Sequence, residues 1–163
     1  MARRRTEQLT DNLYQRLSGG DIGPHADEAI VICTVDAAGW PHPAVLSYFE
    51  VAAVDQHTLH VAVYTNSRTC ANLRERGKAT LIIAAAGLVC YVRGVAVELT
   101  PAMREAAYNA KMQLRIDQVV FDEAPQDLEP GVGVTGGITY SPRTPEALAR
   151  AQAILAELRE PDP

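Results

Sequence analysis

The sequence predicts a mainly β protein, a small antiparallel barrel with peripheral helices, and three observations lead to this fold class. About six apolar, β-branched segments follow one another closely and are separated by short turns. They do not alternate regularly with helices, as a doubly wound parallel sheet would require. Helical periodicity is instead clearest near the two ends of the chain. We therefore expect one domain over residues 1–163, with the barrel core over about 29–140.

The helices are predicted from periodicity and capping. Leucines at every fourth position predict a short amphipathic helix over about residues 6–17. Near the other end, Thr144 and Pro145 have the pattern of an N-cap and a first helical residue, and they predict a helix over about 144–160. A third, shorter helix is expected to end at Gly77.

The expected strands are bounded by turn-forming residues. Ala86-Gly87 indicates a hairpin, and Gly94 indicates a bulge or bend in its second arm. A proline at position 101 and mixed helical periodicity favour a helix over residues 101–120. The strands themselves are expected at residues 29–35, 41–54, 57–65, 78–85, 88–100 and 132–141.

The composition narrows the function. A net charge of −5 and a pI near 5.3 argue against a nucleic-acid-binding surface. The N-terminus has no apolar segment typical of a signal peptide, and the longest apolar run, "LIIAAAGLVCYV", is too short to span a bilayer. Three scattered cysteines are typical of a reducing compartment. We expect a cytoplasmic protein that binds neither nucleic acid nor membrane.

The sequence has no metal-binding pattern. His57 and His60 are three residues apart, so on a strand they point to opposite faces, and no cluster of cysteines or carboxylates accompanies them. Cys33 and Cys90 lie in apolar strand segments and are expected in the core. Cys70 falls in the first turn of the short helix, where the thiol pKa could be lowered. We nevertheless favour structural roles for all three cysteines.

A candidate anion site lies at the start of the short helix, in Ser67, Arg68 and Thr69. A helix N-terminus offers unpaired backbone N–H groups and positive potential, and this sequence adds two hydroxyls and a guanidinium. The helix dipole disfavours a cation in the first turn, and a bound phosphate would remove that penalty on Arg68. The alternative is a plain serine N-cap followed by a solvent-facing arginine.

The order of three segments resembles one known family. The segments "VICTVDAAGWPHPAVLSY", "LHVAVYTNSRTCANLRERGKATLII" and "YVRGVAVEL" look like the FMN-binding split barrel of pyridoxamine 5′-phosphate oxidase-like proteins. The resemblance covers about residues 29–99, and it is the ordered combination of motifs that is specific. It implies a six-stranded antiparallel split β-barrel that binds FMN at a homodimer interface.

The resemblance also implies which residues contact the cofactor. They fall into three groups: the strand that borders the flavin ring and ribityl chain, the strand end beside the flavin, and the phosphate-binding motif. In that order they are Val45, Leu46 and Ser47; Tyr64 and Thr65; and Ser67, Arg68 and Thr69. No side chain stands out as a general acid or base, so no catalytic residue is assigned.

Two departures from the oxidase itself shape the expected function. Thr69 stands where the oxidase usually has a lysine, so one positive charge is missing from the phosphate motif. The C-terminal segment does not match the oxidase segment whose arginine and histidine bind the pyridoxal phosphate substrate. We therefore expect an FMN-dependent oxidoreductase that acts on a different small molecule, with the flavin carrying the electron-transfer chemistry.

Two alternatives on the same barrel remain open. One is a non-enzymatic module that holds flavin or haem, and His42 would then be the first candidate for an axial ligand. The other is a deazaflavin-dependent reductase, which the sequence does not separate from an FMN enzyme because both cofactors carry phosphate.

Overall fold

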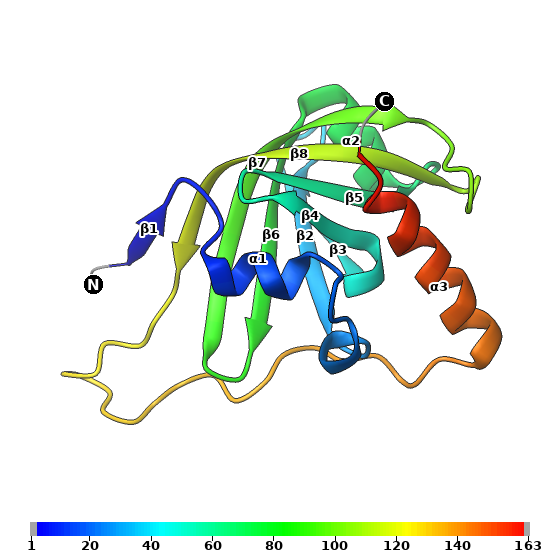
Figure 1. The fold of residues 1–163 in the computed structure, drawn as a ribbon. Helices are drawn as coiled ribbons and strands as arrows, with labels where there is room; N and C mark the ends of the chain where they lie inside the picture. The colour runs from blue at the N-terminus through cyan, green and yellow to red at the C-terminus, as the bar shows by residue number, and fades with distance from the viewer. Residues whose placement is uncertain (1–2, 162–163) are drawn as a thin grey trace.

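The fold is built around one curved antiparallel sheet (Figure 1). A computed structural model describes residues 3–161, in which eight strands are ordered β3-β2-β6-β7-β8-β5-β4, with β1 paired to β8. The two edge strands, β3 and β4, are joined directly by a short turn, which brings the edges of the curved sheet together. The strands are β1 (Arg4–Thr6), β2 (Ala29–Val35), β3 (Pro41–Ser47), β4 (Val51–Asp55), β5 (Thr58–Tyr64), β6 (Lys78–Ala85), β7 (Leu88–Thr100) and β8 (Asn109–Phe121).

Helices cover the outside and the openings of the sheet. They are α1 (Asp11–Leu17), α2 (Arg68–Arg76), α3 (Pro145–Leu158) and the 3-10 turns η1 (Gly23–His25) and η2 (Tyr48–Glu50). In Figure 1, α3 packs along one side of the sheet, and a long segment without helix or strand runs from the end of β8 to its start. Thr144 caps α3 as predicted, since its hydroxyl accepts the N–H of Ala147 at 3.2 Å. Within residues 3–161, no helix is long and apolar enough to cross a membrane.

Two predicted turn features are confirmed. β6 and β7 form a hairpin whose turn contains Ala86 and Gly87. The register of β7 against β8 shifts between Arg93 and Gly94, so the irregularity lies at the predicted position, although the extra residue, Asp117, is on β8 and not on β7. A Cβ added to Gly94 would collide with the backbone carbonyl of Arg115, so the close approach of β8 requires glycine at this position.

The largest difference from the sequence prediction is β8. The pattern predicts a helix over residues 101–120, but the structure has a turn-rich segment followed by the 13-residue strand β8. Ala110, Met112 and Leu114 alternate along β8 and are buried inside the curved sheet. Because β8 pairs with β7 on one side and β5 on the other, strand pairing outweighs the helix propensity of the alanines and methionines in residues 101–120.

The strand count of eight also differs from the expected six. The segment 41–54 is not one strand, because η2 divides it into β3 and β4. Residues 4–6, expected to lie outside the sheet, form β1 against the end of β8. Residues 132–141 make only an isolated bridge, between Glu28 and Thr139. Three glycines in that segment leave few side chains to pack, which weakens a strand.

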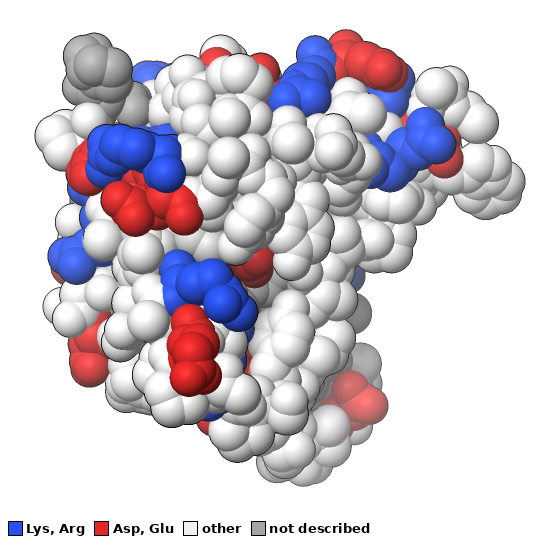
Figure 2. All heavy atoms as spheres, turned by 90° about the vertical axis from the view of Figure 1, so that its right-hand side faces the viewer, with Lys and Arg blue, Asp and Glu red and all other residues white. Residues whose placement is uncertain are grey.

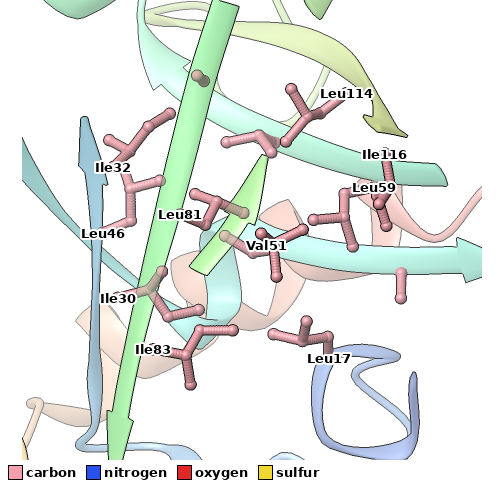
Figure 3. Close-up of a cluster of buried hydrophobic side chains, with 14 of the residues drawn as sticks. Leu17, Ile30, Ile32, Leu46, Val51, Leu59, Leu81, Ile83, Leu114 and Ile116 are labelled. Atoms are coloured by element: carbon pink, nitrogen blue, oxygen red, sulfur yellow. The ribbon is translucent and has the colours of Figure 1, made fainter. Parts of the chain in front are cut away.

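The main core fills the inside of the curved sheet. Side chains from strands far apart in the sequence meet there, and α1 closes one opening with its buried leucines. Figure 3 shows these side chains pointing toward one another from several strands. The residues labelled there are Leu17, Ile30, Ile32, Leu46, Val51, Leu59, Leu81, Ile83, Leu114 and Ile116.

A smaller apolar cluster fixes α3 against the outside of the sheet. Phe49 packs in it with the α3 residues Ile154 and Leu158. Polar contacts hold the last turn of the helix: Nδ1 of His60 lies 2.7 Å from the carbonyl oxygen of Leu158, and Nζ of Lys111 donates to the Glu157 carbonyl at 3.3 Å. These contacts therefore fix the position of α3 against the outside of the sheet.

Candidate functional site

A cleft of about 370 Å³ lies between the edge strand β3, the end of β5 and the side of α3. Its volume is within the range of small-molecule sites. Six of the eight residues matched to the flavin site line it, namely Val45, Leu46, Ser47, Tyr64, Ser67 and Thr69. The fold therefore brings together residues from β3, β5 and α2 that are separated by about twenty positions in the sequence.

The other two matched residues, Thr65 and Arg68, are not among those that line the cleft. The side chain of Arg74 holds Thr65 from the α2 side, since it donates to the Thr65 hydroxyl at 3.0 Å and to the Thr65 carbonyl at 3.3 Å. Arg74 in turn pairs with Glu98 of β7 at 2.5 Å. Thr65 is thus engaged in anchoring the start of α2.

The start of α2 is a helix N-terminus that keeps free donors. The Ser67 hydroxyl accepts the N–H of Cys70 at 3.0 Å and donates to the Tyr64 carbonyl at 2.7 Å. This cap does not engage the N–H groups of Arg68 and Thr69, and these two groups have no acceptor within the helix. Arg68 is exposed, and no hydrogen bond or ion pair engages its guanidinium in the described part of the chain. The start of α2 therefore places two backbone N–H donors and the charge of Arg68 beside the cleft.

On the β3 wall, the backbone turns sharply after Ser47 and places Glu50 in the cleft. The N–H of Ser47 donates to Oε2 of Glu50 at 2.6 Å, which completes a capping box at η2. Burial raises the pKa of the Glu50 carboxyl, while the hydrogen bonds from Ser47 and the charge of Arg143 oppose this rise. Glu50 is an acidic side chain lining the cleft, and no local sequence pattern indicates it.

The opposite wall comes from the C-terminal segment, in Tyr140, Arg143 and Arg150. Arg143 is held by a 2.7 Å hydrogen bond from Nη1 to the Ala26 carbonyl, and its guanidinium lies over the rings of Phe49 and Tyr140, at 4.8 and 5.5 Å from the centroids. Burial, and next the nearby Glu50 carboxylate, raise the pKa of Tyr140. No motif marks these residues, because they reach the cleft only through the packing of α3.

The start of β8 adds Tyr108 and Asn109, which sequence reasoning also missed. Asn109 pairs with Tyr64 in the register of β8 against β5, and the rings of Tyr64 and Tyr108 lie 6.0 Å apart at the rim. The Asn109 side chain is 1% exposed, and its Nδ2 has no hydrogen-bond partner among the described residues. A buried donor without an acceptor is costly, so this amide needs an acceptor from a ligand or water.

The remaining predicted candidates lie outside the cleft lining. Cys70 is fully buried, and burial raises its thiol pKa, so the lowered pKa considered from its place in the helix is wrong. His42 lies on β3 opposite Thr34 and is not among the cleft residues. Within residues 3–161, no group of three or more His, Cys, Asp or Glu side chains is arranged to hold a metal ion.

The face that carries α3 is shown in Figure 2. Most of its surface is uncharged, and the basic groups lie next to acidic ones. This face offers isolated charged groups, as suits the recognition of a small molecule, and no broad basic patch.

Fold and cleft together define a curved antiparallel barrel with a ligand-sized site beside its edge strands. The family model described as "Pyridoxamine 5'-phosphate oxidase" matches residues 24–151. The chain is also 31% identical over 157 residues to the uncharacterised protein YclD of Bacillus subtilis (strain 168), with 95% of this chain and 98% of that protein covered. The chain therefore belongs to the pyridoxamine 5′-phosphate oxidase family, and the resemblance in sequence is confirmed.

Two solved structures share the fold. A candidate pyridoxamine 5′-phosphate oxidase from Lactobacillus delbrueckii is similar with a TM-score of 0.57 and 18% identity, covering 73% of this chain and 98% of that one. An FMN-binding protein from Syntrophomonas wolfei is similar with a TM-score of 0.53 and 15% identity, covering 71% and 90%. At these identities the likeness shows the fold alone, and it confirms the predicted split-barrel class.

Proposed function

We propose that this protein binds FMN in the cleft between β3, β5 and α3, with the phosphate at the start of α2. The observation that carries the proposal is the set of free donors there. The N–H groups of Arg68 and Thr69 have no acceptor within the helix, and the Arg68 guanidinium has no partner in the described chain. A phosphate dianion at this position would satisfy the donors and offset the unfavourable place of a cation at a helix N-terminus.

The rest of the cleft suits the remainder of the cofactor. Val45 and Leu46 of β3 give an apolar wall. Among the solved structures of similar fold is an FMN-binding protein. Thr69 contributes a hydroxyl and no charge, so Arg68 would supply the main side-chain charge for the phosphate.

We further propose that the loaded protein is an oxidoreductase acting on a small molecule. A bound flavin supplies hydride and electron transfer. The residues around it would bind the substrate, orient it against the flavin and keep water out. Glu50 and Tyr140, whose pKa values are raised, face the cleft as groups able to hold a proton. The family resemblance favours a homodimer with the cofactor at the interface, and the three scattered cysteines favour a reducing, cytoplasmic compartment.

The test is an absorption spectrum of the purified protein, followed by titration of the flavin-free protein with FMN. We expect a yellow protein, and we expect Arg68→Ala to weaken FMN binding by about 10- to 100-fold, because a charge-assisted hydrogen bond contributes about 1.5–3 kcal/mol. Arg115→Ala is the matched control, since Arg115 is exposed on β8 and does not line the cleft.

The same titration, repeated with a deazaflavin and with haem, separates the alternative cofactors. Tighter binding of a deazaflavin, or a haem Soret band in place of flavin binding, would overturn the FMN assignment. Turnover of bound flavin by NADH or NADPH would support an enzyme, and flavin that binds but stays unreduced would favour a carrier. Size-exclusion chromatography of the loaded protein tests the dimer.

A further inference from the structure

We propose that the part of the cleft lined by Asn109 of β8 and Arg150 of α3 binds a small planar carboxylate, the class of molecule on which the bound flavin would act. The proposal rests on the proposed function, because the cofactor would fill the part of the cleft near Ser67. The proposal is based on two polar groups of the cleft that have no partner in the described chain, and on the two tyrosine rings at its rim.

Asn109 supplies the first group. Asn109 is buried, with only 1% of its surface accessible to solvent, and it lines the cleft from the start of β8. The Nδ2 amide is a donor without an acceptor in the described chain, so a ligand that fits here should present an oxygen. An apolar ligand would leave this donor buried and unpaired, which selects against it.

Arg150 supplies the second group. It lines the cleft from the exposed side of α3, and no described residue pairs with its guanidinium. Arg143, the other arginine of this wall, is different: it is fixed by the Ala26 carbonyl and two rings, and its charge acts on Glu50. Arg150 is therefore the cation of the cleft that remains available to a ligand.

The balance of charge points to a monoanion. The charged side chains that line the cleft are Glu50, Arg143 and Arg150. With Arg143 offset by Glu50, one positive charge remains, and a planar guanidinium matches a carboxylate in a bidentate pair. A phosphate dianion would bring a second negative charge toward Glu50, so a carboxylate fits this wall better than a phosphate.

The rim favours a flat ligand body. Tyr64 and Tyr108 are half exposed or more, and their rings are tilted by 50° with centroids 6.0 Å apart. Exposed aromatic rings beside an apolar cleft pack well against planar conjugated molecules. The ligand class is therefore a small aromatic or conjugated carboxylate.

The test uses benzoate as the probe and benzamide as its neutral isostere, added to the FMN-loaded protein and followed by the flavin difference spectrum. Benzoate should bind, and Arg150→Gln should weaken it by about 10- to 100-fold while changing benzamide by less than about twofold. Asn109→Ala should weaken both probes by about 2- to 10-fold, because each presents a carbonyl oxygen. Arg115→Gln is the control and should change neither.

Calorimetric titration of the flavin-free protein with the same probes separates this proposal from the proposed function. Benzoate binding that depends on Arg150 in a protein that never binds FMN would support the subsite and overturn the proposed function. FMN binding together with no benzoate binding, or with benzoate binding indifferent to Arg150→Gln, would overturn the subsite alone. Inorganic phosphate that binds more tightly than benzoate, and whose binding is weakened by Arg150→Gln, would overturn the carboxylate assignment.

Discussion

The carboxylate of Glu157, in the last turn of α3, accepts the backbone N–H of Arg104 at 2.8 Å. Its other oxygen accepts the next N–H, that of Glu105, at 2.7 Å. The Glu157 side chain is buried, so this charged group is satisfied by backbone donors of the segment that precedes β8. The contact ties the wall that carries Arg150 to the strand that carries Asn109.

We expect Glu157→Ala to lower the free energy of unfolding by about 2–4 kcal/mol, because two donors lose their acceptor in a part-buried place. Denaturant unfolding measures the change. Glu160→Ala is the control: Glu160 pairs with the Arg104 side chain at 2.7 Å on the surface, where an ion pair adds little. Equal effects of the two substitutions would show that the backbone contacts of Glu157 are not what holds α3.

Gly94 gives a second prediction, about the sheet. An alanine Cβ at this position would run into the carbonyl of Arg115 across the β7–β8 bulge, and backbone cannot yield as a side chain can. We expect Gly94→Ala to cost about 2–3 kcal/mol or more in the free energy of unfolding. Gly133→Ala, where nothing lies within 4 Å, should be neutral or slightly stabilising. A Gly94→Ala protein as stable as the Gly133→Ala protein would refute the close approach.

How far the sequence predicted this structure depends on whether the signal was local. The β6–β7 hairpin, the irregularity at Gly94 and the Thr144 cap are each encoded in a few neighbouring residues, and each is confirmed. β8 is not encoded in that way. Its alternation of buried residues has meaning only once β5 and β7 flank it, so local periodicity favoured a helix.

The residues of the candidate site also differ in whether a local sequence pattern predicts them. Residues within the segments that resemble the family, such as Ser47, Tyr64 and Ser67, could be placed by resemblance, and they do line the cleft. Asn109 and Arg150 could not, because each reaches the cleft through long-range pairing or helix packing that no short motif records. Their polarity gave no signal either, since an isolated asparagine or arginine in a sequence is most often a solvated surface residue.

The three cysteines allow a test of burial in the native state. Cys70 and Cys90 are fully buried, and burial raises both thiol pKa values, that of Cys90 to about 12. Cys33 is partly exposed. At pH 8 a thiol-disulfide reagent should therefore modify one thiol quickly and the other two only after unfolding. Cys33→Ser should remove the fast reaction, and fast modification that persists in this variant would contradict the burial of Cys70 and Cys90.

Glu50 predicts how stability depends on pH. Burial is the largest influence on its carboxyl and holds the folded pKa above the ordinary value of 4.5. The native state then takes up this proton at a higher pH than the unfolded state does, so acidification from the folded pKa down to 4.5 removes the penalty of a buried carboxylate. We expect the unfolding free energy of the wild type, minus that of Glu50→Gln, to rise across this window. Glutamine keeps an acceptor for the Ser47 N–H, so it isolates the charge. A difference that falls on acidification would mean that the hydrogen bonds from Ser47 and the charge of Arg143 outweigh burial.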